Sequence, residues 1–331
     1  MKVTFFFPYK IISGVPILFA NMANALSKLN YEVSIIDYHD GVLWGQSNDL
    51  VNKIKFEDGK KLIINDNSFL VLQAITLNSI RPELHISDNQ KIFFWQLHPN
   101  NFSLNNIFKI SFIDKIINSC RFHSKNKIKK TLLEIDSREG IVYMDGANYY
   151  NTNNTYSLKL SKKILPIIIN ENRKYNKIEK INKKINISYV GRISDFKYFP
   201  LLKVIQQINV LVLNKKIDVE FFIFGDGEFK EALIDQIKQI SFKINFIGFV
   251  SNNNLLSVLS HHEININFAM GTSVLDSSFI GIPTVVLNFY YVEMRNTPKY
   301  NWIYEELDFS VGKELFKQDF NIYNFNSLEK I

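Results

Sequence analysis

The second half of the chain alternates short hydrophobic segments with longer amphipathic ones, and this alternation constrains the fold more than any other feature. The short segments are rich in Ile, Val and Phe and have the length of strands, whereas the longer ones have the apolar spacing of helices. Strands separated by helices form a parallel sheet that is covered on both faces. We expect strands at residues 187–190, 218–224, 244–247, 263–268 and 284–287, and helices at 199–213, 228–240, 252–260 and 272–281.

The first half shows the same alternation in a weaker form. Residues 2–7 are a continuous apolar run, which is typical of a strand buried on both faces. Pro16 suits a first helical turn, and apolar residues from Leu18 to Leu29 then recur on one helical face. A strand at 31–37 completes a β-α-β unit. We expect further strands at 61–65, 69–74, 91–96 and 140–144, and a polar loop at 148–155.

The pattern predicts an α/β protein with two doubly wound, Rossmann-like domains that face each other across a cleft. The length of 331 residues fits two domains. Ligands of such sheets bind at the carboxyl ends of the strands, so this geometry suits two substrates, each held by one domain. We place the first domain at 1–175, a linker in the charged segment 176–186, the second domain at 187–300 and a C-terminal tail at 301–331.

Composition and the lengths of the apolar runs exclude membrane-spanning and disulfide-bonded classes of protein. Hydrophobic residues make up 46% and charged residues 21%, as in soluble globular proteins. Pro8 and Lys10 interrupt the apolar N-terminus, and no run reaches the about 18 apolar residues of a membrane span. The single cysteine, Cys120, cannot form an intrachain disulfide, so a reducing cytoplasm is expected.

Net charge is +7 and is carried mostly by lysine. Base readout favours arginine, so nucleic acid is the weakest of the candidate partners. A diffuse lysine surface fits either a solvated exterior or contact with anionic lipid headgroups.

A glycine and two cations follow the predicted strand at 187–190. Gly191 lets the chain turn, Arg192 follows it, and Lys197 comes five residues later. Two cations near backbone amides suit a diphosphate, whose negative charge grows when it leaves. A surface loop with two solvated cations is the alternative.

A second candidate anion site opens the predicted helix at 272–281. Gly271 ends the preceding strand, and Thr272 or Ser273 begins the helix, where N–H groups without helical partners bind anions. We expect Asp276 in the first helical turn, where its carboxylate can accept from paired hydroxyls such as a ribose diol. Ser273 and Asp276 also fit a capping box, which needs no ligand.

Three further positions are weaker candidates. Gly14 lies in the first strand-to-helix turn, where backbone N–H groups meet a phosphate or sugar, or it is a plain loop glycine. The turn Gly225-Asp226-Gly227 leaves room for a ligand, or Asp226 merely caps the next helix. His98 follows the strand at 91–96 and could orient a hydroxyl, act as a base or make a structural hydrogen bond.

No metal site is expected. His261 and His262 are adjacent in sequence, and no third ligand is evident near them. No Asp-x-Asp pair lies in a suitable place, so we expect Arg192 and Lys197 to take the part of a metal ion.

Between residues 187 and 283 the chain resembles a known family. The segments VGR with a following lysine, FIFGDGE, INFIGFV and FAMGTSVLDSSFIGIPTVV resemble, in this order, the nucleotide-sugar-binding domain of family 4-like glycosyltransferases of the GT-B fold. The first half is similar in pattern only. The segment NWIYEELDFSVG is similar to the stretch that follows in polysaccharide-assembling members, where such folds return across to the first domain.

The resemblance implies roles for matched residues. Arg192 and Lys197 would hold the donor diphosphate beside Gly191, and the N–H groups of Thr272 and Ser273 would contact phosphate. Asp276 matches the second glutamate of a Glu-x7-Glu segment and would bind the ribose. The base would lie along Ile247, Gly248, Phe249 and Val250. The donor-facing loops would contain Gly14, Gly225, Asp226, Gly227 and Gly271.

Two positions depart from the family pattern. Phe268 stands where the first glutamate is found, and that glutamate usually touches the donor sugar. Tyr198 replaces the usual glycine after the lysine. A non-catalytic nucleotide-binding or scaffold protein of the same fold is therefore an alternative.

The resemblance implies a metal-independent, hexosyltransferase-type glycosyltransferase without a cofactor. It would move a sugar from a nucleotide-diphosphate sugar, bound by the second domain, to a saccharide acceptor, free or lipid-linked, bound by the first. The family implies retention of anomeric configuration and a place in the synthesis of lipopolysaccharide or capsule. We expect a cytoplasmic protein, either free or peripheral at the inner face of the cell membrane. The sequence also leaves room for a nucleotide-sugar epimerase or a nucleic-acid binder.

Overall fold

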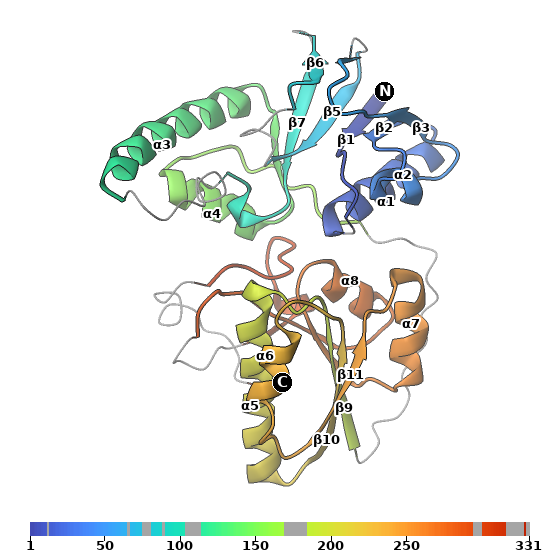
Figure 1. The fold of residues 1–331 in the computed structure, drawn as a ribbon, viewed down its shortest axis with the longest axis vertical. Helices are drawn as coiled ribbons and strands as arrows, with labels where there is room; N and C mark the ends of the chain where they lie inside the picture. The colour runs from blue at the N-terminus through green and yellow to red at the C-terminus, as the bar shows by residue number, and fades with distance from the viewer. Residues whose placement is uncertain are drawn as a thin grey trace. The chain divides into compact units, whose positions relative to one another are not determined.

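The computed structural model divides into two compact units, Met1–Ile168 and Ile169–Ile331. It describes residues 1–11, 13–64, 67–74, 81–87, 90–102, 114–168, 184–293, 300–315 and 328, and only the backbone of residues 100, 114–124 and 252–253. Within this part of the chain, each unit contains one six-stranded sheet with helices on both faces, which is a Rossmann-like arrangement (Figure 1).

The sheet of the first unit has the strand order β3-β2-β1-β5-β7-β8, and all its pairs are parallel. A separate parallel pair is formed by β4 and β6. The strands are β1 (Lys2–Phe6), β2 (Glu32–Asp37), β3 (Asn52–Lys55), β4 (Leu62–Ile64), β5 (Phe69–Gln73), β6 (Leu84–Ile86), β7 (Lys91–Gln96) and β8 (Ile141–Tyr143). The helices are α1 (Gly14–Lys28), α2 (Val42–Gln46), the 3-10 turn η2 (Pro99–Phe102), α3 (Asp114–Ser137) and α4 (Gly146–Tyr156).

Helices cover both faces of this sheet. On one face Phe19 of α1 lies against Phe5 of β1, with ring centroids 5.4 Å apart. On the other face the buried Leu132 of α3 and Tyr156 of α4 share a cluster with Phe6 of β1 (Figure 1). β1 is therefore buried on both faces, as its continuous apolar run predicts.

The sheet of the second unit has the strand order β11-β10-β9-β12-β13-β14. Its pairs are parallel except for β13 and β14, which are antiparallel. The strands are β9 (Lys184–Val190), β10 (Asp218–Phe224), β11 (Lys243–Gly248), β12 (Ile266–Ala269), β13 (Thr284–Val286) and β14 (Asn301–Trp302). The helices are α5 (Asp195–Lys215), α6 (Lys230–Gln236), α7 (Asn252–His261), α8 (Thr272–Phe279) and the 3-10 turn η4 (Ile303–Glu305).

β10 shows how the second core is built. Phe221 and Ile223 pack in one cluster with residues of α5 and α6, whereas Phe222 and Phe224 pack on the opposite face with residues of α7. Figure 1 shows α5 and α6 on one side of this sheet and α7 on the other. Because successive residues alternate between two buried faces, the last four residues of β10, Phe221 to Phe224, are all apolar rather than alternating.

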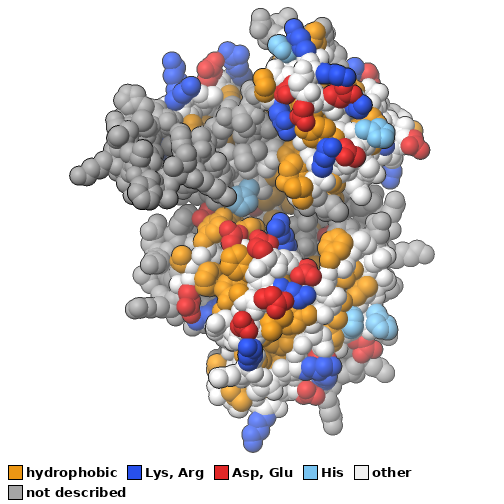
Figure 2. Space-filling model, in the orientation of Figure 1, with side chains coloured by type: hydrophobic (Ala, Val, Ile, Leu, Met, Phe, Trp, Pro, Cys, Tyr) orange, Lys and Arg blue, Asp and Glu red, His pale blue; other side chains and the backbone are white. Residues whose placement is uncertain are grey.

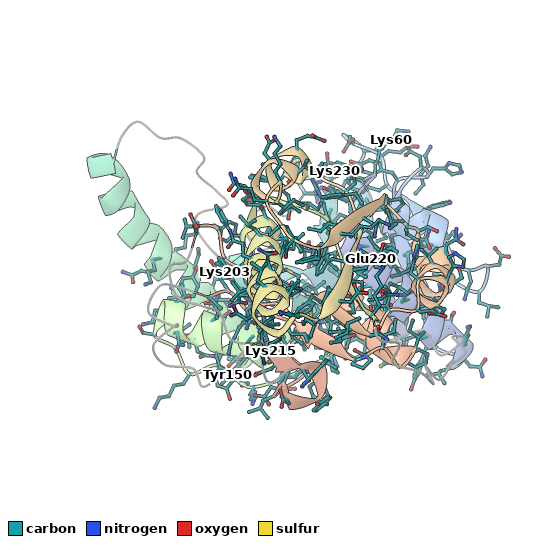
Figure 3. All side chains as sticks on the ribbon, turned by 90° about the horizontal axis from the view of Figure 1, so that it is seen from below. Lys60, Tyr150, Lys203, Lys215, Glu220 and Lys230 are labelled. Atoms are coloured by element: carbon teal, nitrogen blue, oxygen red, sulfur yellow. The ribbon has the colours of Figure 1, made fainter. Side chains whose placement is uncertain are left out.

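Glu220 brings a charge into this sheet. Glu220 is 9% exposed. Its carboxylate forms ion pairs with Lys184 of β9 and with Lys243 of β11, and the distance to Lys243 Nζ is 2.9 Å. Asn245 Nδ2 also donates to it at 2.7 Å. Figure 3 shows Glu220 among the strands. Hydrogen bonding to Lys184, followed by that to Lys243 and Asn245, lowers the pKa of Glu220 to about 2.

Residues 148–155 are helical, and the prediction of a polar loop was wrong. They belong to α4, whose N-cap Asp145 accepts a hydrogen bond from the Asn148 N–H at 2.8 Å. The buried Thr152 hydroxyl donates to Gln96 Oε1 at 2.8 Å. The polar residues of this segment thus find capping and buried partners, which its loop-like composition does not reveal.

Several predicted boundaries also shift. α5 begins at Asp195, so Lys197 lies in a first helical turn rather than in the preceding loop. α6 ends at Gln236, earlier than predicted. β9 begins at Lys184, inside the segment 176–186 that we expected to be a linker, and the residues of that segment before the strand lie outside the described part.

β3, β6 and α3 had no counterpart in the prediction, because they are short or rich in Lys and Asn.

The expected tail at 301–331 begins with β14, which extends the second sheet. Its Glu314 bridges to Phe289, and Leu328 packs on the core of the same unit. Residues 316–327 and 329–331 lie outside the described residues.

Candidate functional site

The loops that follow β9 and β10 are joined backbone to backbone at the carboxyl end of the second sheet. The Gly191 N–H donates to the Phe224 carbonyl, and the Ile193 N–H donates to the Asp226 carbonyl, each at 3.0 Å. A Cβ atom on Gly225 would lie 1.9 Å from the Gly191 carbonyl oxygen, so this contact requires glycine. The sheet thus brings together the predicted residues Gly191, Arg192, Gly225, Asp226 and Gly227.

Asp226 does not cap α6. The N-cap of that helix is Phe229, and the Asp226 carboxylate instead accepts from the Gly227 N–H at 2.9 Å. The turn is therefore held by the Asp226 side chain and by the β9 loop, and the alternative in which Asp226 merely caps the next helix was wrong.

Lys197 lies beside the same loop. Its Nζ is 3.6 Å from the position that a Cβ on Gly191 would occupy, and its side chain is partly buried. No carboxylate among the described residues forms an ion pair with it. Burial, and after it the charge of Arg192, lowers the pKa of Lys197 to about 8. An anionic ligand would relieve both effects, because it would supply the missing opposite charge.

Arg192 is more exposed and has a partner. Its Nη2 lies 3.0 Å from Oε2 of Glu228, and the two side chains are 68% and 47% exposed. An ion pair of this exposure contributes about 1 kcal/mol or less, so a solute can compete for the guanidinium group. The two predicted diphosphate ligands thus differ, because one has a counter-ion and the other has none among the described residues.

The end of β11 adjoins this surface. Gly248 forms an antiparallel bridge with Gly225, which follows the neighbouring strand. Phe249 is 70% exposed and Ile247 is 37% exposed, whereas Val250 packs on the cluster beneath α7. This segment, which was expected to lie along a nucleotide base, therefore offers an exposed aromatic ring and backbone groups at the edge of the sheet.

The start of α8 is the second predicted anion site. Its N-cap Gly271 has φ 68° and ψ −144°, a conformation that favours glycine, and its N–H donates to the Val311 carbonyl at 2.8 Å. Within the described residues, the N–H groups of Thr272 and Ser273 make no hydrogen bond. They are the unpaired amides of a helix N-terminus, which bind anions.

The two anion sites follow neighbouring strands. β12 pairs with β9, and Ala269 lies opposite Val190, so α8 begins next to the loop that carries Arg192. Both sites therefore lie at the carboxyl edge of one sheet, where open α/β sheets bind ligands.

Asp276 lies in the second turn of α8, and its prediction in the first turn was wrong. Because Gly271 is the N-cap, Asp276 is the fifth helical residue, and no side chain caps the helix. The capping box between Ser273 and Asp276 is accordingly not formed. Asp276 is partly buried, and its role as a ribose ligand stays a prediction.

Phe268 is a core residue. Its side chain is 1% exposed and lies against Tyr300, with ring centroids 6.0 Å apart, in the cluster that α5 covers. The position that the resemblance matches to the first glutamate is thus occupied by a buried apolar side chain of β12.

Gly14 belongs to the first unit, where it is the first residue of α1. A Cβ atom there would meet nothing within 4 Å, so local packing does not require glycine. The loop before it is tied to β2, because the buried Asp37 carboxylate accepts from the Tyr9 N–H at 2.9 Å. The same carboxylate accepts from the N–H of Trp44 in α2 at 3.0 Å. Burial raises the pKa of Asp37 despite these hydrogen bonds.

His98 also belongs to the first unit and follows β7 in a closed turn. Asn101 Oδ1 accepts from the N–H groups of Leu97 and His98, each at 3.0 Å, and the Asn101 N–H donates to the His98 carbonyl at 3.0 Å. The turn fixes the backbone of His98 at the carboxyl end of its strand and leaves the side chain partly exposed. Its catalytic role stays a prediction.

The described surface mixes charges of both signs. Figure 2 shows lysine and arginine side chains next to acidic ones on the face in view. In the described part of the chain, no group of three His, Cys, Asp or Glu side chains is placed to hold a metal ion. His262 packs on the ring of Phe222 with centroids 4.8 Å apart, and burial lowers its pKa. None of the described helices is both long and apolar enough to span a membrane.

Two contacts of this site were missed from the sequence. Glu228 ends the segment Gly225-Asp226-Gly227-Glu228 that the sequence singled out, but its contact with Arg192 could have been inferred only with β10 placed next to β9. Val311, whose carbonyl holds Gly271, carries no signal in the sequence, because its contact is made by backbone alone.

Comparisons with known proteins identify the fold of this protein. No family model and no curated protein matches the chain. It is similar to the crystal structure of TarM, with a TM-score of 0.54 and 10% identity over 97% of this chain and 89% of that one. It is also similar to the lipopolysaccharide outer core galactosyltransferase WaaB, with a TM-score of 0.52 and 10% identity over 86% and 80% of the two chains. A glycosyltransferase from Rickettsia africae ESF-5 gives a TM-score of 0.51 and 13% identity over 86% and 78%. The protein thus has the two-domain GT-B fold, with two Rossmann-like units, that these glycosyltransferases have.

Proposed function

We propose that this protein is a glycosyltransferase that moves a sugar from a nucleotide-diphosphate sugar to a saccharide acceptor. The observation that carries the proposal is the position of Arg192 and Lys197 at the carboxyl end of β9, next to the unpaired amides of Thr272 and Ser273. Two cations and a helix N-terminus at one sheet edge suit the charge of a diphosphate.

Each group has a part in the proposed reaction. When the bond between the sugar carbon and the diphosphate oxygen breaks, negative charge grows on the diphosphate, and Arg192 and Lys197 stabilise it without a metal ion or cofactor. Asp276 binds the ribose hydroxyls, and Phe249 lies against the base. His98 of the first unit binds the acceptor hydroxyl or the donor sugar. We infer retention of the anomeric configuration from the family resemblance.

The acceptor class is inferred from the resemblance and from the structural neighbours. One neighbour is a TarM variant from S. aureus in complex with fondaparinux, alpha-GlcNAc-glycerol and UDP, and another, WaaB, is a lipopolysaccharide outer core galactosyltransferase. These support a saccharide acceptor in cell-surface polysaccharide synthesis, either free or lipid-linked. A cytoplasmic enzyme at the inner face of the membrane would meet such an acceptor.

The test is thermal unfolding of the wild type, Arg192→Ala and Lys197→Ala with UDP, GDP, ADP and CMP. A ligand at about 100 times its Kd adds roughly 2.7 kcal/mol, which raises the Tm by several degrees. We expect one nucleotide to raise the Tm of the wild type and each variant to lose most of that rise. If no nucleotide stabilises the wild type, or both variants respond as it does, the donor site is wrong.

A scaffold protein of the same fold is the second candidate, and the buried Phe268 in place of a glutamate favours it. Nucleotide binding alone does not separate the two. The separating measurement is release of the nucleoside diphosphate from its sugar conjugate, because an enzyme of this class also transfers slowly to water. Binding without release would support the scaffold.

A further inference from the structure

We propose that Glu228 is the counter-ion that holds Arg192 while the donor site is empty, and that the diphosphate of the donor displaces it. The inference rests on the proposed function, because it takes Arg192 as a ligand of the diphosphate. Glu228 would then set the affinity of the site rather than contact the sugar, which makes it a positioning residue.

The backbone places the two side chains together. Arg192 and Glu228 stand on the loops that follow β9 and β10, and these loops are joined on either side of the pair. The Ile193 N–H donates to the Asp226 carbonyl at 3.0 Å, and the Phe229 N–H donates to the Ile193 carbonyl at 3.2 Å. The pair at 3.0 Å therefore forms between fixed neighbours, without movement of either loop.

The contact leaves Arg192 able to change partners. Glu228 binds it through one nitrogen, Nη2, and both side chains are about half or more exposed. A hydrogen bond from its own backbone N–H, and after it the pair with Arg192, lowers the pKa of Glu228, so the carboxylate is ionised at neutral pH. A diphosphate on the same guanidinium group would lie next to this negative charge, and like charges repel at such a distance. Binding thus requires Glu228 to move away.

The consequence concerns release as well as binding. Whatever free energy holds Glu228 on Arg192 is subtracted from the binding of every diphosphate, including the nucleoside diphosphate that remains after transfer. Because product release limits the turnover of many enzymes, a built-in competitor would speed turnover while it weakens donor binding. Lys197, which has no carboxylate partner in the described residues, would attract the anion first.

The Glu228→Gln variant removes the charge of this side chain and keeps its shape. Glutamine has the same size and its carbonyl oxygen can still accept from Arg192, but it carries no charge. We expect Glu228→Gln to bind UDP, GDP or ADP, whichever the wild type binds, about two- to fivefold more tightly, the range of an exposed ion pair. The corresponding nucleoside without phosphates should bind as it does to the wild type. Isothermal calorimetry gives both constants.

Two controls make the test specific. Asp235→Asn removes one negative charge from the exposed pair that Asp235 of α6 forms with Lys238, and it should leave the Kd unchanged. In an Arg192→Ala background, Glu228→Gln should no longer tighten binding, because no guanidinium group remains to compete for. Tightening of equal size in that background would show a general charge effect and overturn the proposal.

The outcomes also separate this inference from the proposed function. Unchanged or weaker binding by a folded Glu228→Gln, with normal binding by the wild type, overturns the counter-ion role alone. If the wild type binds none of the three nucleotides, the donor site itself is wrong. If the wild type has a higher kcat than Glu228→Gln and also binds the donor more weakly, the proposed part of Glu228 in product release is supported.

Discussion

The Gly191 carbonyl oxygen lies 1.9 Å from the place that a Cβ atom on Gly225 would occupy, so the loops after β9 and β10 meet through their main chains. No side chain separates the turn that carries Arg192 from the turn that carries Glu228. The candidate donor surface is therefore shaped by backbone contacts, and a single methyl group at position 225 should deform it.

Gly225→Ala tests this contact. The new Cβ must push the two loops apart, because the neighbouring atom is backbone and cannot rotate away. We expect a loss of about 1–3 kcal/mol in the free energy of unfolding, the usual cost of overpacking, and a loss of nucleoside diphosphate binding. Gly45→Ala in α2 is the control, since a Cβ there meets nothing within 4 Å. Equal stability of the two variants would contradict the close approach.

The affinity for a diphosphate should depend on pH through Lys197. Its pKa of about 8 is below the ordinary value because of burial, so in the free protein it loses its charge as the pH rises through 8. A bound diphosphate favours the charged form, and binding above pH 8 therefore takes up a proton and weakens by up to about tenfold per pH unit. Calorimetry from pH 7 to 9.5 in buffers of different ionisation enthalpy measures both effects.

Lys197→Arg is the matched variant for this pH profile. Arginine keeps its charge across the range, so any binding that it retains should change little with pH. A wild type whose affinity is constant from pH 7 to 9.5 would show that Lys197 is not in contact with the diphosphate.

Substitution of Asp276 tests whether its side chain contacts the ribose of the nucleotide. If its carboxylate accepts from the ribose hydroxyls, Asp276→Asn weakens binding of the nucleoside diphosphate by about tenfold, as expected for a hydrogen bond to a charged group. The same variant should bind the 2′,3′-dideoxy nucleotide as the wild type does, because that ligand lacks both hydroxyls. Equal weakening for both nucleotides would place Asp276 outside the ribose contact.

The strand pattern predicted the second unit well because its strands are buried on both faces. β10 is an example, because it is apolar from Val219 to Phe224 apart from Glu220. Arg192 and Thr272 could be placed at one edge because each comes a few residues after a predicted strand, and parallel strands end at one edge. The predicted helix start at residue 272 was correct, but Asp276 was placed one turn too early, because Ser273 was considered as the N-cap and Gly271 holds that position.

Other features depend on contacts between distant segments. The inner side of α4 is polar, and its Thr152 is buried only because Gln96 of β7 supplies a partner. The partner of Arg192 became visible only with the strand order of the sheet. Local composition does not reveal such contacts. The sequence therefore predicted a loop at residues 148–155 and left open the alternative that Arg192 and Lys197 are solvated cations on a surface loop.

Glu220→Gln should destabilise the second unit in a pH-dependent way. The pKa of Glu220 is lowered to about 2, chiefly by Lys184, so its ion pairs stabilise the fold above its unfolded pKa near 4.5 and lose that effect as the pH falls toward 2. We expect Glu220→Gln to cost roughly 1–3 kcal/mol at pH 7. Urea unfolding at pH 7 and pH 3 should show the difference from the wild type shrinking at the lower pH. Asp235→Asn, in a pair where both partners are about two-thirds exposed, should change stability little at either pH.

Phe268→Glu tests whether the family's missing glutamate could be restored. Phe268 lies in the core against Tyr300, and a carboxylate buried there without a partner is strongly unfavourable. We expect loss of more than about 4 kcal/mol, or no folded protein, and no gain in donor turnover. Phe268→Leu, which keeps an apolar side chain, should remain folded and bind the nucleotide. A stable and more active Phe268→Glu would show that the side chain at this position can turn toward the donor, and would remove the main support for a scaffold role.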